Sequence, residues 1–446
     1  MNDTAKNRRA APVVIARPDH NVSRANISKN ALKVLYRLNE GGYKAFIVGG
    51  GVRDLLLGRE PKDFDVATDA HPEDVRRLFR NCRLIGRRFR LAHVHFGREI
   101  IEVATFRGAS DDESAGREGD TLVDESGRIL RDNAYGDIDD DVWRRDFTAN
   151  ALYYNISDFS IWDYTGGADD VRNGVMRLIG DPESRYREDP VRMLRAVRFA
   201  AKLGFRIEPA SEAPISKLGA LLGDMPPARL YEEALKLFLG GSALPSYELL
   251  RHYGLFHHLF PGATAELDRE GSDVARALFL AALANTDERV VADAPVSPMF
   301  LFGVFLWPAV KRLAETLHLE GAPPMTAMMD AFDTIVRSQQ DHISIPRRHS
   351  TPMKEMMVMQ LRFRRQQTRR ALRILDHPRF RAAYDLLRLR VAVGEEDASV
   401  EAFWTNLQNA NPDQRQAAVK DEPGGGRRRR RSPRRRRKPK AAGPQD

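Results

Sequence analysis

Two aspartates separated by one residue, Asp63 and Asp65, are the side chains of this sequence with the clearest capacity for chemistry. On a strand over residues 63–67, both carboxylates would project from one face, about 7 Å apart, while Phe64 would point into the core. Carboxylates at that spacing can share a pair of Mg²⁺ ions, which activate a hydroxyl and stabilise a leaving pyrophosphate. An Asp-x-Asp pattern alone is weak, because most such pairs are solvated.

A glycine turn upstream strengthens the interpretation. Gly49, Gly50 and Gly51 follow a strand expected at 44–48 and precede a short helix expected at 52–57. A triphosphate can lie close to a backbone that carries no side chains. A strand, a glycine turn, a short helix and then two aspartates on the next strand are a rare conjunction, which favours nucleotidyl transfer over a plain tight turn.

This conjunction resembles the DNA polymerase β-like nucleotidyltransferase superfamily. More closely, the chain resembles the class II branch, which contains bacterial poly(A) polymerases and tRNA CCA-adding enzymes. The supporting segments are EVATFR at 102–107, RRDFTANAL at 144–152 and REDPVRMLRAVRF at 187–199. The resemblance covers about 45–205 and implies an Mg²⁺-dependent enzyme with ATP as a substrate.

The resemblance also implies roles for particular residues. Asp63, Asp65 and Asp146 would be catalytic, with Asp63 and Asp65 holding Mg²⁺ and Asp146 as the third acid. Glu102, on an expected strand, is the rival for that third position. A helical start in this segment would put Asp146 and Asn150 on one face, near a ribose and a phosphate; the alternative is a helix cap and a solvated amide.

Base selection is expected from the segment around Pro190. By resemblance, Asp189 and Arg192 form a hydrogen-bonding template for the Watson–Crick edge of the incoming base. Three arginines recur on one face of the helix expected there, and the alternative is a solvated stripe. The nucleotide-binding residues predicted in this way are Gly49, Gly50, Arg53, Arg107, Asn150, Glu188, Asp189, Arg192, Arg195 and Arg198.

The predicted fold is an α+β N-terminal nucleotidyltransferase head, with a mixed sheet and helices, followed by an all-α body and a disordered basic C-terminal tail. Further head strands are expected at 91–96, at 100–106 and twice within 151–164, with an acidic mobile insertion at 110–141. The predicted division is a flexible N-terminal segment at 1–26, the head at 27–180, a helical nucleotide-selecting neck at 181–265, a helical RNA-binding body at 266–410 and the tail at 411–446.

The formal charge of +9 comes from the tail, where 424–446 carry nine Arg and two Lys against one Asp. Such a run attracts polyanions, and nucleic acid is favoured over an acidic membrane surface or a protein. The predicted RNA-binding residues are Arg427, Arg428, Arg429, Arg430, Arg431, Arg434, Arg435, Arg436 and Arg437. The single cysteine excludes an intramolecular disulfide. With no signal-peptide pattern and no long apolar run, a cytoplasmic location is expected.

Within the class II branch, three features favour poly(A) addition over CCA addition. The segment LIGRRFRLAHV at 84–94 resembles one that tends to mark bacterial poly(A) polymerases, the tail suits arbitrary single-stranded RNA, and no His-Asp doublet of a metal phosphohydrolase occurs. The expected reaction is template-independent addition of AMP from ATP to RNA 3′ ends, with release of pyrophosphate, which promotes RNA decay.

Two alternatives remain for the function: a tRNA CCA-adding nucleotidyltransferase, and an RNA-binding protein on an inactive transferase fold. The expected partners are single-stranded RNA 3′ ends and ATP, and RNA-degradation proteins are a further possibility. The resemblance implies a monomer.

Overall fold

The computed structural model describes residues 11–86, 90–108, 121–123, 129–132, 135–366, 369–411 and 414–415. No helix within these ranges is long and apolar enough to cross a membrane. The contacts divide the chain into two units, residues 1–354 and 355–446. The finer division into five parts stays a prediction, and the arginines predicted to bind RNA in the tail lie outside the described residues.

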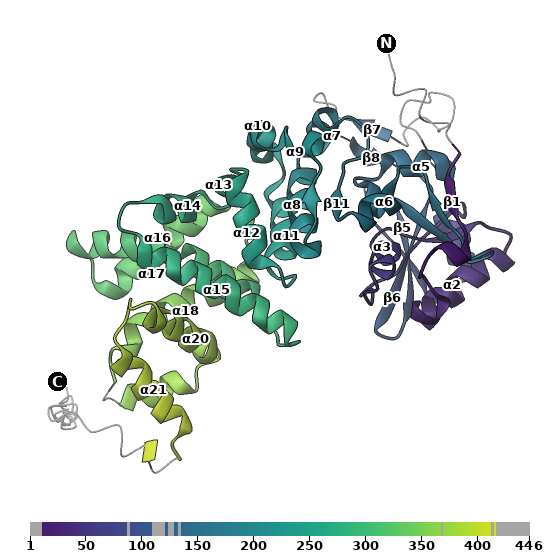
Figure 1. Ribbon diagram of the computed structural model, residues 1–446. Helices are drawn as coiled ribbons and strands as arrows, with labels where there is room; N and C mark the ends of the chain where they lie inside the picture. The colour runs from purple at the N-terminus through teal and green to yellow at the C-terminus, as the bar shows by residue number, and fades with distance from the viewer. Residues whose placement is uncertain are drawn as a thin grey trace, which may run out of the picture. The chain divides into compact units, whose positions relative to one another are not determined.

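An eight-stranded sheet carries the N-terminal part of the first unit (Figure 1). All neighbouring strands are antiparallel except β3 and β6, which are parallel, so the predicted mixed sheet is confirmed. In spatial order the strands are β1 (Val13–Ile15), β10 (Ile161–Asp163), β9 (Leu152–Asn155), β2 (Ala45–Val48), β3 (Asp65–Thr68), β6 (Glu99–Thr105), β5 (Leu91–Phe96) and β4 (Cys82–Ile85). Strand β1 falls in the segment expected to be flexible.

The parallel pair in the middle of the sheet decides which acids become neighbours. The chain leaves β3, passes through helix α4 (Pro72–Leu78) and the β4–β5 hairpin, and returns as β6. This connection is long enough for a crossover between parallel strands. The resulting register pairs Asp65 with Glu102, so two carboxylates from distant parts of the sequence meet on adjacent strands.

The prediction that Asp63 and Asp65 share a strand is wrong. Strand β3 begins at Asp65, which pairs with Val48 at the end of β2. Beyond Val48 the chain turns away into helix α3 (Gly50–Leu56), so the ladder on that side offers no partner for Asp63. Phe64 is buried as expected, and Asp63 lies in the loop just before the strand.

Two helices flank the glycine turn. Helix α2 (Lys29–Glu40) begins after Ser28, whose side chain accepts a hydrogen bond of 3.0 Å from the Ala31 amide. Helix α3 begins earlier than predicted, directly after Gly49, whose φ of 71° lies in the left-handed region that favours glycine. The turn therefore presents backbone amides rather than side chains at the start of α3.

The predicted mobile insertion at 110–141 falls largely outside the described residues. Two short antiparallel strands are described within it, β7 (Thr121–Val123) and β8 (Ile129–Asp132). Its last part contradicts the prediction, because helix α5 (Ile138–Arg144) begins there with a capping box between Asp137 and Asp140. Acidic residues at a helix start bind free amides and favour the helix dipole, so the acidic composition marks a helix N-terminus here.

The rest of the first unit is helical, as predicted. After the short helix α6 (Gly167–Arg172), a parallel pair of β11 (Val175–Met176) and β12 (Arg206–Ile207) brackets the neck helices α7 and α8. The helices are α7 (Pro182–Glu188), α8 (Val191–Leu203), α9 (Pro209–Glu212), α10 (Ile215–Leu218), α11 (Pro227–Phe238), α12 (Ala243–His252), α13 (Phe256–Leu259), α14 (Pro261–Asp268), α15 (Asp273–Val291), α16 (Pro298–Leu319) and α17 (Pro324–Gln339).

Helix α18 (Arg347–Phe363) runs across the boundary into the second unit, which continues with α19 (Arg369–Leu375), α20 (Phe380–Ala392) and α21 (Ala398–Asn409). The core of this unit holds Trp404, whose ring lies 5.0 Å from Phe363 and 5.8 Å from Phe380 between centroids. The indole N–H of Trp404 donates to the Phe363 carbonyl. The second unit therefore has an aromatic core of its own.

Helix α6 approaches the backbone before β9 so closely that only glycine fits. A Cβ on Gly167 would overlap the carbonyl of Thr148, whereas a Cβ on Gly262 in α14 would meet nothing within 4 Å. We therefore predict that Gly167→Ala lowers the free energy of unfolding by about 2 kcal/mol or more, and that Gly262→Ala changes it little. Urea unfolding of both variants measures the difference, and equal midpoints would contradict this packing.

Candidate active site

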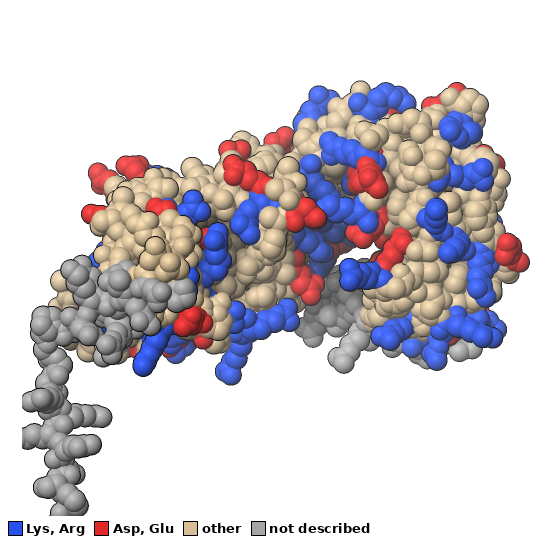
Figure 2. All heavy atoms as spheres, turned by 90° about the horizontal axis from the view of Figure 1, so that it is seen from below, with Lys and Arg blue, Asp and Glu red and all other residues tan. Residues whose placement is uncertain are grey.

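Every site residue predicted in the head and neck lines one pocket of about 1040 Å³. The pocket lies between the sheet, the glycine turn and helix α8, and Figure 2 shows a hollow in this face with Lys and Arg gathered around it and Asp and Glu beside them. It also contains cations that the sequence did not indicate, namely Arg59, Lys62, Arg144, Arg185, Lys202, Arg229 and Lys236. The volume lies at the upper end of the range of small-molecule sites.

The floor of the pocket is acidic. Asp63 and Asp65 come from the loop and first residue of β3, and Glu102 is the neighbour of Asp65 on β6. Burial, the nearby Glu102 and the nearby Asp63 raise the pKa of Asp65 to about 6, although Arg145 opposes them. His93, opposite Glu102 on β5, has its Nε2 at 3.3 Å from Oε2 of Glu102. The floor therefore concentrates negative charge that a cation would stabilise.

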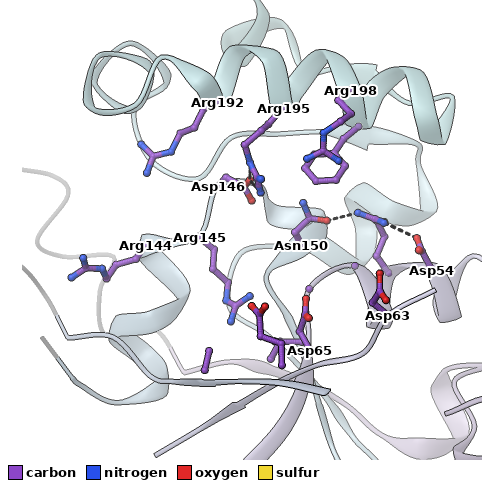
Figure 3. Close-up of a pocket in the computed structure, with 18 of the residues that line it drawn as sticks. Asp54, Asp63, Asp65, Arg144, Arg145, Asp146, Asn150, Arg192, Arg195 and Arg198 are labelled. Atoms are coloured by element: carbon purple, nitrogen blue, oxygen red, sulfur yellow. Dashed lines mark hydrogen bonds and ion pairs between the residues drawn. The ribbon is translucent and has the colours of Figure 1, made fainter. Parts of the chain in front are cut away.

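The arginine of helix α3 is held by neighbours inside the pocket. Arg53 is 2% exposed, and its guanidinium donates to Asn150 Oδ1 at 2.5 Å and to Asp54 Oδ1 at 2.7 Å (Figure 3). Two predicted nucleotide-binding residues, Arg53 and Asn150, thus bind each other. Their contact fixes the start of α3 against the segment that precedes β9.

The segment from Arg145 to Asn150 is not the helical start that was predicted. Its backbone is extended at Phe147 and pairs with Leu178, with hydrogen bonds from the Ile179 amide to the Asp146 carbonyl and from the Thr148 amide to the Arg177 carbonyl. A short 3₁₀ helix, η3 (Thr148–Asn150), follows. Burial of Phe147 and this backbone pairing replace the helix, so Asp146 reaches the pocket from an extended segment.

Asp146 faces the neck and not the acidic floor. Its Oδ2 accepts from Nε of Arg195 at 2.7 Å, and Figure 3 shows it directly beneath Arg195. Although burial opposes ionisation, Arg195 holds the pKa of Asp146 below its usual range. The structure thus brings Glu102 beside Asp65, while it pairs Asp146 with an arginine of α8.

The three arginines of α8 point from one face of the helix into the pocket (Figure 3). Arg192 donates to Glu188 at 2.8 Å and to the Arg185 carbonyl at 2.7 Å, and Arg198 donates to Glu233 at 2.5 Å. The side chains of Arg192 and Arg198 are 14% and 12% exposed. The alternative of a solvated stripe is therefore wrong, and the opposite face of α8 is buried.

Asp189 has a partner that the sequence did not indicate. Its Oδ2 accepts from Nη2 of Arg229 at 2.6 Å, and its Oδ1 accepts from the Val191 amide at 3.3 Å. Arg229 lies on α11, forty positions beyond Asp189, and only the packing of α11 against α8 brings it near. No spacing rule in the sequence links the two residues.

Positive charge is concentrated at the pocket edge between α5 and α7. Burial and the charges of Arg107 and Arg185 lower the pKa of Arg144 to about 10. Arg185 donates to the carbonyls of Arg144 and Arg145 at 3.2 and 2.7 Å and so ties α7 to the end of α5. This edge is suited to bind a polyanion.

Comparisons with known proteins match three segments of the chain to family models. The family of the poly A polymerase head domain matches residues 45–177, the probable RNA and SrmB- binding site of polymerase A matches 204–267, and the polymerase A arginine-rich C-terminus matches 320–438. The chain is 51% identical over 411 residues to poly(A) polymerase I of Escherichia coli O157:H7, which covers 90% of this chain and 87% of that protein. The identity to poly(A) polymerase I of Salmonella typhi is 48% over 418 residues, 92% of this chain and 88% of that one.

CCA-adding proteins match less of the chain or at lower identity. The CC-adding tRNA nucleotidyltransferase of Halalkalibacterium halodurans is 36% identical over 239 residues, 54% of this chain and 56% of that protein. A solved structure of a CCA-adding enzyme in an apo form has a TM-score of 0.58 at 20% identity and covers 89% of both chains, which shows the shared fold. With about half of all positions identical to poly(A) polymerases I across nine tenths of its length, the chain belongs to the poly(A) polymerase family of nucleotidyltransferases.

Proposed function

We propose that the pocket joins AMP from ATP to the 3′ hydroxyl of an RNA strand, without a template, and releases pyrophosphate. The chain is a polynucleotide adenylyltransferase of the poly(A) polymerase family. We assign this reaction to the pocket because its acidic floor faces several arginine side chains. Such an arrangement suits a reaction in which a polyanion meets divalent cations.

The donor set on the floor fits Mg²⁺. Within the described residues, no group of three or more His, Cys, Asp or Glu side chains is arranged to hold a metal by itself. Mg²⁺ commonly uses only one or two carboxylates and takes its remaining ligands from substrate phosphates and water. We propose that Asp63 and Asp65 hold the ion, which would lower the pKa of the attacking hydroxyl and neutralise the leaving pyrophosphate.

Glu102 is a better candidate than Asp146 for the third catalytic acid. Glu102 lies beside Asp65 in the β3–β6 register, whereas the Asp146 carboxylate already binds Arg195. We therefore propose that Glu102 adds to the negative charge around the ion. Asp146 keeps a role in the pocket because it fixes the position of Arg195.

The neck supplies nucleotide selection in this proposal. Asp189 accepts from the amino group of adenine, and Arg192 donates to a ring nitrogen. Arg229 and Glu188, which hydrogen-bond to Asp189 and Arg192, orient these two side chains. Arg195 and Arg198, with Arg107 and the amides of Gly49 and Gly50, bind the phosphates.

Chemistry at the phosphorus demands little of the protein beyond this positioning. The 3′ hydroxyl attacks the α-phosphorus in line, and pyrophosphate leaves along the glycine turn. Arg145, which lies between Asp65 and α8 (Figure 3), faces the developing negative charge. RNA 3′ ends are the proposed acceptors, and a cytoplasmic location, a monomeric state and contacts with RNA-degradation proteins stay proposals.

The first experiment supplies an unstructured RNA oligomer, Mg²⁺ and one nucleotide at a time to the wild type and to Asp65→Ala. We expect long products with ATP alone and none from the variant, because the ion loses its ligand. Electrophoresis resolves the products by length, and circular dichroism checks that the variant is folded.

Other products of this experiment would indicate a different function for the protein. Growth by two or three nucleotides that requires CTP and a tRNA end would indicate CCA addition. The absence of extension under every condition would indicate an RNA-binding protein on an inactive fold. Full activity of Asp65→Ala would exclude this residue from the reaction.

The raised pKa of Asp65 predicts a pH-dependent cost of folding in metal-free protein. An unfolded aspartate has a pKa of about 3.9, so the native state binds the proton more tightly, and stability falls as the pH rises from about 4 to about 6. Asp65→Asn cannot ionise, so we expect it to be more stable than the wild type in EDTA, by a margin that grows over this range and is constant above it. Urea unfolding at pH 4.5, 6 and 8 measures the margin.

Asp169→Asn is the matched control, since Asp169 is exposed on α6 and its side chain is 72% exposed. It should differ little from the wild type at every pH. Equal stability of Asp65→Asn and wild type at pH 8 would contradict the proposed crowding of charge on the floor.

Removal of 424–446 should weaken RNA binding and reduce its dependence on salt, because fewer counterions are released on binding. Extension of RNA at saturating concentration should persist. Filter binding across a salt series measures the slope for the full chain, the truncated chain and a full chain with the nine tail arginines changed to lysine. The lysine variant should keep the slope; an unchanged slope after truncation would assign the tail to another partner.

A further inference from the structure

Arg145 is held on two of its three guanidinium nitrogens by buried groups. Its Nε donates to the hydroxyl oxygen of Tyr153 at 2.6 Å and to Oδ2 of Asp141 at 3.1 Å. Its Nη2 also donates to Oδ2 of Asp141, at 2.8 Å. The guanidinium carbon also lies 4.9 Å from the centroid of the Tyr153 ring. The side chain is thus fixed both in position and in orientation.

A third hydrogen bond closes this arrangement. The Tyr153 hydroxyl donates to Asp141 Oδ2 at 2.7 Å, and Tyr153 and Asp141 are 0% and 6% exposed. Burial raises the pKa of Tyr153 well above its usual value, so the hydroxyl keeps its proton. Although burial opposes ionisation, Arg145 holds the pKa of Asp141 below its usual range. The carboxylate, the phenol and the guanidinium therefore form one closed hydrogen-bonded ring, which we call the Arg145 clamp.

The remaining nitrogen of Arg145 faces the glycine turn. A Cβ placed on Gly49 would lie 3.9 Å from Nη1 of Arg145, 3.9 Å from the Asn150 carbonyl and 4.0 Å from Oδ2 of Asp65. Within the described residues, Nη1 of Arg145 donates no hydrogen bond to another protein group. Arg145 also lines the pocket. Its two N–H bonds are therefore available at the point where the turn and the acidic floor meet.

We propose that Asp141 and Tyr153 are positioning residues that aim Nη1 of Arg145 at the pyrophosphoryl group of the nucleotide. The inference rests on the proposed function, since it needs a triphosphate along the glycine turn. A donor fixed before the substrate arrives stabilises developing charge without reorganisation. Neither residue touches the substrate, and both act through Arg145.

The test compares Tyr153→Phe with Tyr154→Phe. Both tyrosines are fully buried on β9, on opposite faces, but the hydroxyl of Tyr154 has no hydrogen-bond partner within the described residues. We expect Tyr153→Phe to raise the KM for ATP and the dissociation constant for inorganic pyrophosphate about tenfold each, as loss of a hydrogen bond to a charged group would. The RNA affinity should match that of Tyr154→Phe, whereas the Tm of Tyr153→Phe should be lower, because Asp141 and Arg145 lose a buried hydrogen-bond partner.

A double-mutant cycle separates the clamp from a merely structural role. In an Arg145→Gln background, Tyr153→Phe should change neither constant further, because the group that it positions is gone. Asp141→Asn is the second variant, which keeps the shape of the side chain and removes its charge. It should weaken pyrophosphate binding in the wild-type background and leave it unchanged in Arg145→Gln.

Each result decides for or against the clamp. Equal constants for Tyr153→Phe and Tyr154→Phe, or an undiminished effect in the Arg145→Gln background, would overturn it. Calorimetry measures pyrophosphate binding even if the protein adds no AMP to RNA. Failure of the clamp can therefore be distinguished from failure of the proposed function. A wild type that polymerises ATP and is impaired by Arg145→Gln, but not by Tyr153→Phe or Asp141→Asn, would refute the clamp alone.

Discussion

The ion pair between Asp146 and Arg195 is the contact on which the pocket depends. It joins the extended segment before β9 to helix α8, and so sets the sheet with its acids opposite the arginines of the neck. The hydrogen bonds from Arg185 to the carbonyls of Arg144 and Arg145 act in the same direction. A buried carboxylate without its partner would cost several kcal/mol, so Asp146 and Arg195 stabilise the fold only as a pair.

The charges around the pocket are balanced locally but not across it. Arginines of α8 bind acids of the neck and head, and Asp189 binds Arg229. On the floor, by contrast, Asp65 is buried near two further carboxylates, and burial together with these charges raises its pKa. A nucleotide with its metal ion carries both signs of charge and can complete both sides at once. The unbalanced charges of the floor and of the arginines are therefore in place before the substrate binds, and the substrate with its metal ion neutralises them.

Local sequence patterns predicted much of this structure. The strands around the glycine turn, the hairpins at 91–106 and 151–164, and the buried face of α8 follow from alternation, turn residues and helical spacing. The pocket residues of the head and neck also came together as expected. The functional roles of these residues remain proposals.

The errors arose where tertiary pairing overrode local preference. Asp63 lies outside β3 because β2 ends at Val48, and the segment at Asp146 is extended because it pairs with Leu178. Neither partner is near in sequence. Arg229 and Tyr153 were missed for a related reason, since their roles depend on which atoms face them in the folded protein.

Strand β1 pairs with β10, so Val13 lies opposite Asp163 in the finished sheet. Strand β2 likewise has β9 as one neighbour, more than a hundred positions further along the chain. During synthesis the first strands leave the ribosome long before these partners exist, and helix α8, which forms the far wall of the pocket, emerges later still. Domains fold as units as the chain grows, so the nascent protein acquires its nucleotide site late, only after both the closing strands and the neck have been made.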